Sequence, residues 1–297
     1  MSAPGRVGVV TPEPALLKIA LPNKGSLAES TSSMLREAGY KQRTDTKDLV
    51  LVDETNGVEF YYLRPRDIAV YVGERTLDLG VTGRDLLLDS GAKATEIMPL
   101  GFGGTKFRFA APGGSDWKLD DLEGCRLATS FPGLLERFLV QRGITARLIH
   151  LDGAVESAVR LGVADAIADV VETGSTLRRA GLDVFGPPIL ESEAILIQPA
   201  GAPEPPGLAR LQRRISGVMT ARSYRMIAYN VESAKLDAAC RITPGIDSPT
   251  ISPLARDGWL AVQAMIPAKD AAVIMDDLWE VGAEGILVTD IAACRLS

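Results

Sequence analysis

Residues 166–177 bring together several groups that can bind a phosphate. The apolar segment Ala166–Val171 predicts a strand, and the turn Thr173-Gly174-Ser175-Thr176 follows it before a new helix. A glycine-containing turn between a strand and a helix presents several backbone N–H groups together, and the start of the helix adds a partial positive charge. The hydroxyl side chains add donors at the same place. We interpret the turn as a phosphate site, although an ordinary N-capping turn uses the same residue types.

Asp169 lies four residues before Thr173, near the end of the predicted strand. A carboxylate at this position can accept hydrogen bonds from ribose hydroxyls or hold a cation-bound water. The acid therefore strengthens the interpretation of the turn as a phosphate site.

The chain has a single histidine, His150, in the alternating apolar segment Arg147–Leu151. Ser-His-Asp and Cys-His catalysis both need a histidine, but this one is expected to be a solvent-facing or hydrogen-bonded residue of a strand. The three cysteines, Cys125, Cys240 and Cys294, are scattered and form no CxxC motif, so neither a disulfide framework nor a zinc site is expected. The chemistry is expected to rest on carboxylates, Lys and Arg side chains, hydroxyls and backbone amides.

The composition excludes several classes of function. The chain has 297 residues and a net charge of −6, which excludes a protein that is basic in bulk and binds nucleic acid, although a local basic pocket remains open. No apolar run approaches the ~20 residues that span a bilayer. The first fifteen residues lack the apolar region of a secretory signal. We expect a soluble cytoplasmic protein that binds neither nucleic acid nor membrane.

From residue 17 onward, short apolar strands alternate with helices, which predicts an α/β fold with a largely parallel sheet. Asn56-Gly57 between two apolar segments is a hairpin signal. A second block of this style begins near Thr105, and two such lobes commonly enclose a ligand cleft. The predicted strands are Leu17–Leu21, Leu49–Val52, Glu59–Leu63, Leu77–Gly83, Phe107–Ala111, Arg126–Thr129, Arg147–Leu151, Ala166–Val171 and Ala194–Gln198. The predicted helices are residues 27–38, Asp67–Gly73, Leu134–Gln141 and Ala154–Leu161.

The pattern changes after residues 199–207, which form a loop rich in proline and glycine. We expect a short helix at Leu208–Ile215 and a strand-rich segment at Gly217–Val231. The order of the following elements predicts a small βαββαβ domain of the ferredoxin-like type. These elements are expected at Ser233–Cys240, Thr250–Leu254, Trp259–Ile266, residues 271–278 and Gly285–Thr289.

The segment Glu156–Leu177 resembles the signature of ATP phosphoribosyltransferase, the first enzyme of histidine biosynthesis. The matched signature positions are Glu156, Gly162, Ala164, Ile167, Asp169, Thr173, Gly174, Thr176 and Leu177. Further matches in the family's order are Ala20–Gly25, Leu63–Ile68, Gly80–Asp85 and Leu151–Glu156. The resemblance runs from about residue 17 to the end of the chain, and residues 218–297 resemble the regulatory domain of the family's long form.

The resemblance implies an α/β fold with a two-lobed, periplasmic-binding-protein-like catalytic part and a C-terminal ferredoxin-like, ACT-like domain. The expected division is a flexible N-terminal tail at 1–16, lobe I at 17–104 and 196–217, lobe II with the phosphoribosyl pyrophosphate loop at 105–195, and a regulatory domain at 218–297.

The resemblance also implies the reaction. N1 of the ATP adenine attacks C1′ of 5-phosphoribosyl 1-pyrophosphate, Mg²⁺ is required, and pyrophosphate leaves. An oxocarbenium-like centre with a highly charged leaving group needs positioning and charge neutralisation more than a protein nucleophile. A single histidine in the chain is therefore compatible with this reaction.

The site residues that the resemblance implies fall into three groups. The catalytic candidates are Asp169, Lys24 and Arg84. The candidates for binding phosphoribosyl pyrophosphate are Asp152, Gly153, Glu156, Asp169, Thr173, Gly174, Ser175 and Thr176. The candidates for binding ATP are Lys24, Arg64, Arg84 and Ser130. A solvated surface charge remains the alternative for each cation, as does a plain helix N-terminal acid for Asp152. Mg²⁺ is expected to be held mainly by substrate phosphates.

Feedback inhibition by histidine is expected through the last domain, at Asn230, Thr250, Ser252 and Met265, together with assembly of dimers into a homo-hexamer. A domain that only assembles oligomers is the alternative. Two departures from the family pattern affect these expectations. Ser130–Gly133 replaces a more usual Tyr-Pro-Asn, and Asn230 replaces an acid found in some relatives.

A different class of protein would show a similar pattern of elements: a two-lobed module that binds a small anion without catalysis. A secreted module would need a signal peptide, and a regulator would need a DNA-binding helix pair, neither of which is evident. A catalytically silent relative is a third possibility, against which the intact segment from Asp169 to Thr176 argues.

Overall fold

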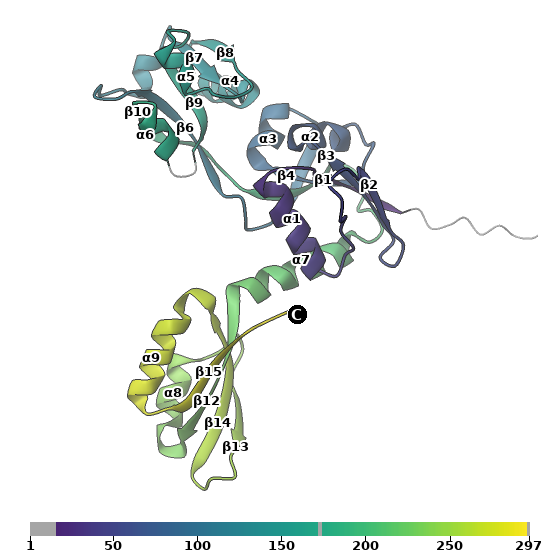
Figure 1. The fold of residues 1–297 in the computed structure, drawn as a ribbon, viewed down its shortest axis with the longest axis vertical. Coiled ribbons are helices and arrows are strands. Elements are labelled where there is room, and N and C mark those ends of the chain that lie inside the picture. The colour runs from purple at the N-terminus through teal and green to yellow at the C-terminus, as the bar shows by residue number, and fades with distance from the viewer. Residues whose placement is uncertain (1–15, 172–173, 296–297) are drawn as a thin grey trace, which may run out of the picture. The chain divides into compact units, whose positions relative to one another are not determined.

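The computed structural model describes residues 16–171 and 174–295 (Figure 1). The chain divides into two compact units. Unit 1 comprises the residues up to Ser32 together with Lys41–Gly207, and unit 2 comprises Ser33–Tyr40 together with the residues from Leu208 onward. Helix α1 (Ser26–Glu37) contributes to both units.

The first sheet of unit 1 forms lobe I and has the strand order β2-β3-β1-β4-β11-β5. Strands β3, β1 and β4 are parallel, whereas β2, β11 and β5 pair in the antiparallel sense with their neighbours. The strands are β1 (Leu17–Pro22), β2 (Val50–Asp53), β3 (Val58–Leu63), β4 (Leu79–Gly83), β5 (Ala94–Pro99) and β11 (Ala194–Pro199). The helices of this lobe besides α1 are α2 (Pro65–Gly73) and α3 (Arg84–Ser90).

Helix α2 packs closely on this sheet because its apolar face meets a glycine. Ile68 and Val72 are fully buried. A Cβ at Gly80 of β4 would lie 2.6 Å from a methyl carbon of Ile68 and 2.9 Å from one of Val72. The hairpin predicted at Asn56-Gly57 is confirmed, with Gly57 at a φ of 67° between β2 and β3. A positive φ of this kind costs glycine little.

The second sheet of unit 1 forms lobe II and has the order β10-β6-β9-β7-β8. Strands β8, β7 and β9 are parallel, and β6 and β10 are antiparallel. The strands are β6 (Thr105–Pro112), β7 (Arg126–Thr129), β8 (Arg147–His150), β9 (Ala166–Val171) and β10 (Leu182–Ser192). The helices are η1 (Leu119–Leu122), α4 (Pro132–Arg142), α5 (Ser157–Arg160) and α6 (Ser175–Arg179).

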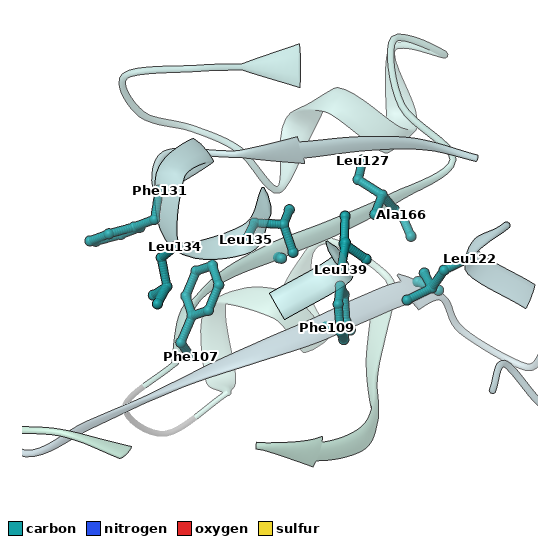
Figure 2. Packing of buried hydrophobic residues seen from close by; sticks show 11 residues of the cluster. Phe107, Phe109, Leu122, Leu127, Phe131, Leu134, Leu135, Leu139 and Ala166 are labelled. Atoms are coloured by element: carbon teal, nitrogen blue, oxygen red, sulfur yellow. The ribbon is translucent and has the colours of Figure 1, made fainter. Parts of the chain in front are cut away.

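The core of lobe II forms between α4 and the sheet (Figure 2). Leu135 and Leu139 of α4 pack in the same cluster as Phe109 and Leu127. The ring of Phe131, just before α4, meets Phe107 edge-on with centroids 5.4 Å apart. This packing anchors the loop between β7 and α4 to β6, because the buried Phe131 ring lies against Phe107.

Two short segments join the lobes, residues 100–104 between β5 and β6 and Glu193 between β10 and β11. They hydrogen-bond to each other, since Gly101 N–H donates to the Glu193 carboxylate at 3.0 Å. The first residue of β11 adds two bonds, because Leu100 N–H donates to the Ala194 carbonyl and Ala194 N–H donates to the Phe102 carbonyl. Unit 1 is thus the two-lobed, periplasmic-binding-protein-like α/β arrangement that the sequence predicts.

Unit 2 contains a four-stranded antiparallel sheet of order β13-β14-β12-β15. This order confirms the predicted ferredoxin-like domain. Residues of α8 and α9 form one core with the sheet, and Figure 1 shows these helices on one of its faces. The elements are α7 (Leu208–Ser223), β12 (Tyr224–Glu232), η2 (Ser233–Lys235), α8 (Leu236–Ile242), β13 (Thr250–Pro253), β14 (Trp259–Pro267), η3 (Ala268–Asp270), α9 (Ala271–Val281) and β15 (Glu284–Asp290).

The largest error of the sequence prediction concerns α7. The helix expected to end at Ile215 continues to Ser223, so the strand-rich assignment is wrong for residues 217–223. Val218 and Ala221 continue the buried stripe begun by Leu211 and Ile215 at helical spacing. The helix therefore passes through residue 217, where a domain boundary was placed.

Other differences from the sequence prediction are smaller. Strand β10 was not predicted, and its ladder to β6 is interrupted between Phe185 and Leu190, around a Gly-Pro-Pro segment. Helix α5 is shorter than the predicted Ala154–Leu161 because Ala154 has a φ of 50°, which a right-handed helix cannot contain. The second segment of lobe I was predicted to begin at residue 196. Strand β11, which belongs to the sheet of lobe I, begins two residues earlier, at Ala194.

Candidate active site

Asp169 lies on β9, close to its C-terminal end, as the sequence predicts. Its Oδ1 accepts a hydrogen bond from Ser130 Oγ at 3.1 Å and another from the Val170 N–H at 2.8 Å. Ser130 follows β7, which runs parallel to β9. The carboxyl ends of parallel neighbours meet at one sheet edge, which is where open α/β sheets bind ligands.

The environment of Asp169 works against its ionisation. Burial raises the pKa of this carboxyl, and the charge of Glu156 raises it further. The hydrogen bonds from Val170 and Ser130 and the positive charge of Arg66 lower the pKa but leave the net shift upward. A half-buried acid with a raised pKa and defined partners is typical of functional sites.

Three of the four residues of the predicted phosphate turn, Gly174, Ser175 and Thr176, lie at the start of α6. Gly174 has a φ of 69° and caps α6. Ser175 and Thr176 are exposed in the first turn of that helix, while Leu177 is buried and anchors it. Thr173, the fourth predicted residue of the turn, lies outside the described residues.

The segment after β8 supplies the other predicted ligands of the phosphoribosyl group. Glu156 is half-buried and acts electrostatically on Asp169. Asp152 and Gly153 are exposed, and the Asp152 carboxylate lies 3.5 Å from His150 Nε2. His150 is an exposed residue at the end of a strand, as expected.

Lys24, Arg64 and Arg84 each follow one of three adjacent parallel strands of lobe I. Strands β1 and β3 align so that Pro22 pairs with Leu63, and Asn23 N–H donates to the Leu63 carbonyl at 2.8 Å. Lys24 and Arg64 therefore leave the sheet at the same edge, and both are exposed.

Arg84 differs from these two because protein carboxylates already balance its charge. It donates to both carboxylate oxygens of Glu96, at 2.7 and 2.8 Å, and to Glu193 at 3.3 Å. These glutamates raise the pKa of Arg84 above its usual value. The side chain thus ties lobe I to the connection that Glu193 makes between the lobes.

A cavity of about 440 Å³ lies beside these connections. Its volume suits a small-molecule ligand. The lining includes Arg84, Phe102, Lys106, Val171 and Glu193, and Val171 is two residues after Asp169.

The sequence analysis missed Arg66, on α2. Its Nη2 donates to the Ser130 carbonyl at 2.7 Å, its Nη1 lies 3.3 Å from Asp89, and its guanidinium is 4.7 Å from the centre of the Phe131 ring. Arg66 belongs to the matched segment Leu63–Ile68, but nothing in that segment indicates which side chains of lobe II it meets.

The four residues predicted to bind an effector share one face of the sheet in unit 2. In register, Asn230 and Ser252 both pair with Ala261, Thr250 pairs with Gln263, and Met265 pairs with Met226. The opposite face carries the buried residues Ile227, Tyr229 and Val231, which belong to the core with α8 and α9. Met265 also lines a cavity of about 300 Å³ together with Ile246 and Ile274.

Within residues 16–171 and 174–295, no three His, Cys, Asp or Glu side chains group as they would around a metal ion. Over the same residues, no helix has the length and apolar character to cross a membrane.

Comparisons with known proteins identify the family of the chain. A family model described as ATP phosphoribosyltransferase matches residues 64–217, and one described as the HisG C-terminal domain matches residues 221–293. The ATP phosphoribosyltransferase of Arthrobacter sp. (strain FB24) is 55% identical over 286 residues, covering 95% of this chain and 100% of that protein. That of Kocuria rhizophila is 57% identical over 281 residues, with the same coverage of 95% and 100%.

A solved structure is similar to part of the chain. A chain of the ATP phosphoribosyl transferase (HisG:HisZ) complex from Thermotoga maritima aligns with a TM-score of 0.58 at 25% identity, covering 68% of this chain and 99% of that one. The full-length matches extend through unit 2 as well. The chain therefore belongs to the ATP phosphoribosyltransferase family of histidine biosynthesis, as a member of its long form.

Proposed function

We propose that the ATP phosphoribosyltransferase reaction uses the sheet edge at Asp169 to bind phosphoribosyl pyrophosphate. The observation that carries this proposal is the Asp169 carboxylate, which lies on the strand that leads to Gly174 at the start of α6 and accepts a hydrogen bond from Ser130. Asp169 accepts the ribose hydroxyls, while the backbone N–H groups and hydroxyls of residues 173–176 bind the 5′-phosphate. C1′ is then held for attack by N1 of the adenine.

This arrangement matches the needs of the reaction. The bond from C1′ to pyrophosphate breaks as the bond to adenine N1 forms, so positive charge develops on the ribose and negative charge on the leaving group. A fixed carboxylate near the ribose and fixed donors near the phosphates stabilise that distribution better than water does. Glu156 adds negative charge on the ribose side, and Asp152 and Gly153 extend the same loop.

Lys24 and Arg64 are the proposed cations for pyrophosphate or ATP phosphates. Both are exposed at one edge of lobe I. Arg84 is reassigned, because its guanidinium is already paired with Glu96 and Glu193. We propose that it holds the connection between the lobes.

Mg²⁺ enters the proposal as an ion held mainly by the substrate phosphates. Mg²⁺ typically retains water and binds through one or two carboxylates plus phosphates. The carboxylates at the Asp169 edge are oxygen donors of the kind it prefers, which fits a Mg²⁺-bound substrate. When bound, the ion neutralises the leaving pyrophosphate. We assign it no protein ligand.

Unit 2 is proposed to bind histidine and to assemble the enzyme into dimers and a hexamer. The four candidate residues lie on one face of the sheet, with Thr250 and Ser252 exposed and Asn230 and Met265 half-buried. Inhibition requires that histidine bind one state of the enzyme more tightly than another. The substrates of this pathway step imply a cytoplasmic enzyme.

The test is release of pyrophosphate that requires both ATP and phosphoribosyl pyrophosphate. Asp169→Asn keeps size but removes the charge, so turnover is expected to fall by about 10- to 150-fold, the equivalent of ~1.5–3 kcal/mol. Asp116→Asn, at a carboxylate that is 93% exposed, is the control with unchanged turnover. Circular dichroism confirms folding of each variant. Wild-type turnover in Asp169→Asn would contradict the assignment, and release of no pyrophosphate by the wild type would favour the anion-binding module.

A further inference from the structure

The guanidinium of Arg66 joins the two lobes of unit 1. Arg66 belongs to α2 of lobe I, whereas its partner Ser130 and the Phe131 ring below it belong to the β7–α4 loop of lobe II. A planar guanidinium can serve a carbonyl, a carboxylate and an aromatic ring at once, because its donors are arranged in a rigid fork. Arg66 makes all three contacts.

Asp89 completes the joint from the side of lobe I. One of its carboxylate oxygens faces Arg66, and the other accepts the Leu134 N–H at 3.1 Å, in the first turn of α4. A side chain at Gly133 would overlap the Asp89 carbonyl oxygen, so glycine permits this close approach. Asp89 therefore holds the start of α4 through the Leu134 N–H, and Arg66 holds Ser130, two residues before the helix, through its carbonyl.

Ser130 connects the contacts of Arg66 with the candidate site. Its carbonyl accepts from Arg66 at 2.7 Å, and its hydroxyl donates to Asp169 Oδ1 at 3.1 Å. Ser130 is 8% exposed, so little space is left for its hydroxyl to turn away. One residue thus connects an arginine of lobe I with the carboxylate proposed to receive the ribose.

We propose that Arg66 is a positioning residue for phosphoribosyl pyrophosphate, which fixes Ser130 and, through the Ser130 hydroxyl, the carboxylate of Asp169. This inference rests on the proposed role of Asp169. Burial raises the pKa of Asp169, and the positive charge of Arg66 opposes this rise.

The test measures binding of phosphoribosyl pyrophosphate to the full-length protein by isothermal titration calorimetry. Arg66→Gln is expected to weaken binding by about tenfold, because the bridge from Asp89 to Ser130 is lost. Arg66→Lys keeps the charge but not the fork, and is expected to recover part of the affinity. Arg160→Gln, at an exposed arginine of α5, is the matched control and is expected to bind like the wild type.

A double-mutant cycle separates positioning from simple stabilisation. If Arg66 acts through Asp169, Arg66→Gln has little further effect on binding in the Asp169→Asn background. Full additivity of the two changes would overturn the proposal, as would binding by Arg66→Gln within about twofold of the wild type. Thermal unfolding of each variant shows whether it is folded. If Arg66→Gln does not fold, Arg66→Lys replaces it in the cycle.

The cycle also tests the role of Asp169 and the role of Arg66 separately. If Asp169→Asn binds phosphoribosyl pyrophosphate like the wild type, the proposed role of Asp169 is wrong, and the role of Arg66 falls with it. If Asp169→Asn weakens binding but Arg66→Gln does not, only the inference about Arg66 is wrong.

Discussion

The sheet edge at Asp169 and the proposed effector face of unit 2 (Asn230, Thr250, Ser252 and Met265) present polar residues in different ways. At the first, the carboxylate is half-buried and accepts hydrogen bonds from Ser130 Oγ and the Val170 N–H. On the second, Thr250 and Ser252 lie on the edge strand β13, all four residues of which are exposed. The reaction needs pre-organised groups, whereas an effector face can be completed by its ligand or by a second protomer.

This difference predicts that substitutions at the Asp169 edge weaken substrate binding, whereas substitutions on the proposed effector face of unit 2 change only inhibition by histidine. The largest effect among the following predictions is expected at the phosphate turn. Thr176→Val removes a hydroxyl but nearly keeps shape, and loss of a hydrogen bond to a phosphate costs about 1.5–3 kcal/mol. Phosphoribosyl pyrophosphate is expected to bind about 10- to 150-fold more weakly, with ATP binding much less changed.

Calorimetry with each substrate measures this effect. Thr145→Val, at an exposed threonine elsewhere in lobe II, provides the control. Unchanged affinity in Thr176→Val would remove the turn from the site.

A smaller effect is expected for Thr250→Ala. This change removes a polar group from the effector face, so histidine is expected to inhibit about five- to tenfold more weakly, which lies within a typical coupling energy of ~1–3 kcal/mol. Activity without histidine stays within about twofold of the wild type, because Thr250 lies in unit 2. Inhibition curves for Thr250→Ala and for the control Ser248→Ala measure the difference. A wild-type enzyme that remains fully active in millimolar histidine would contradict the effector assignment.

The smallest effect is a shift in the pH dependence of kcat/KM when Glu156 is changed to Gln. Asp169 accepts hydroxyl donors best when ionised, and burial raises its pKa, so kcat/KM is expected to fall as the pH drops through that raised value. The negative charge of Glu156 contributes to the rise. Glu156→Gln is therefore expected to lower the pKa of Asp169 and to move the acid limb to lower pH.

The profile of Glu136→Gln, at an exposed acid of α4, serves as the control for Glu156→Gln. An acid limb that stays in place or moves to higher pH in Glu156→Gln would show that Asp169 does not govern it.

Sequence reasoning located the Asp169 edge because its signals are local. The acid, the glycine and the hydroxyls lie within eight residues, and the turn needs the positive φ that Gly174 has. The alternation of strands and helices predicted both lobes and the ferredoxin-like sheet for the same reason, since periodicity over a few residues reports burial.

What the sequence could not show depends on contacts between distant residues. The pairing of Arg84 with Glu96 and Glu193 joins residues up to 109 positions apart. Arg66 and Ser130 are 64 positions apart. The continuation of α7 through Gly217 was missed because glycine usually weakens a helix, whereas here a Cβ at that position would collide with the Cys294 carbonyl oxygen.

The central claim is that the phosphoribosyl group binds at the Asp169 edge, and a crystal structure of the full chain with phosphoribosyl pyrophosphate tests it most directly. The account predicts ribose hydroxyls within hydrogen-bond distance of the Asp169 carboxylate and a 5′-phosphate at the N–H groups of residues 174–176. A phosphoribosyl group bound away from Asp169, with the Gly174 turn empty, would contradict it.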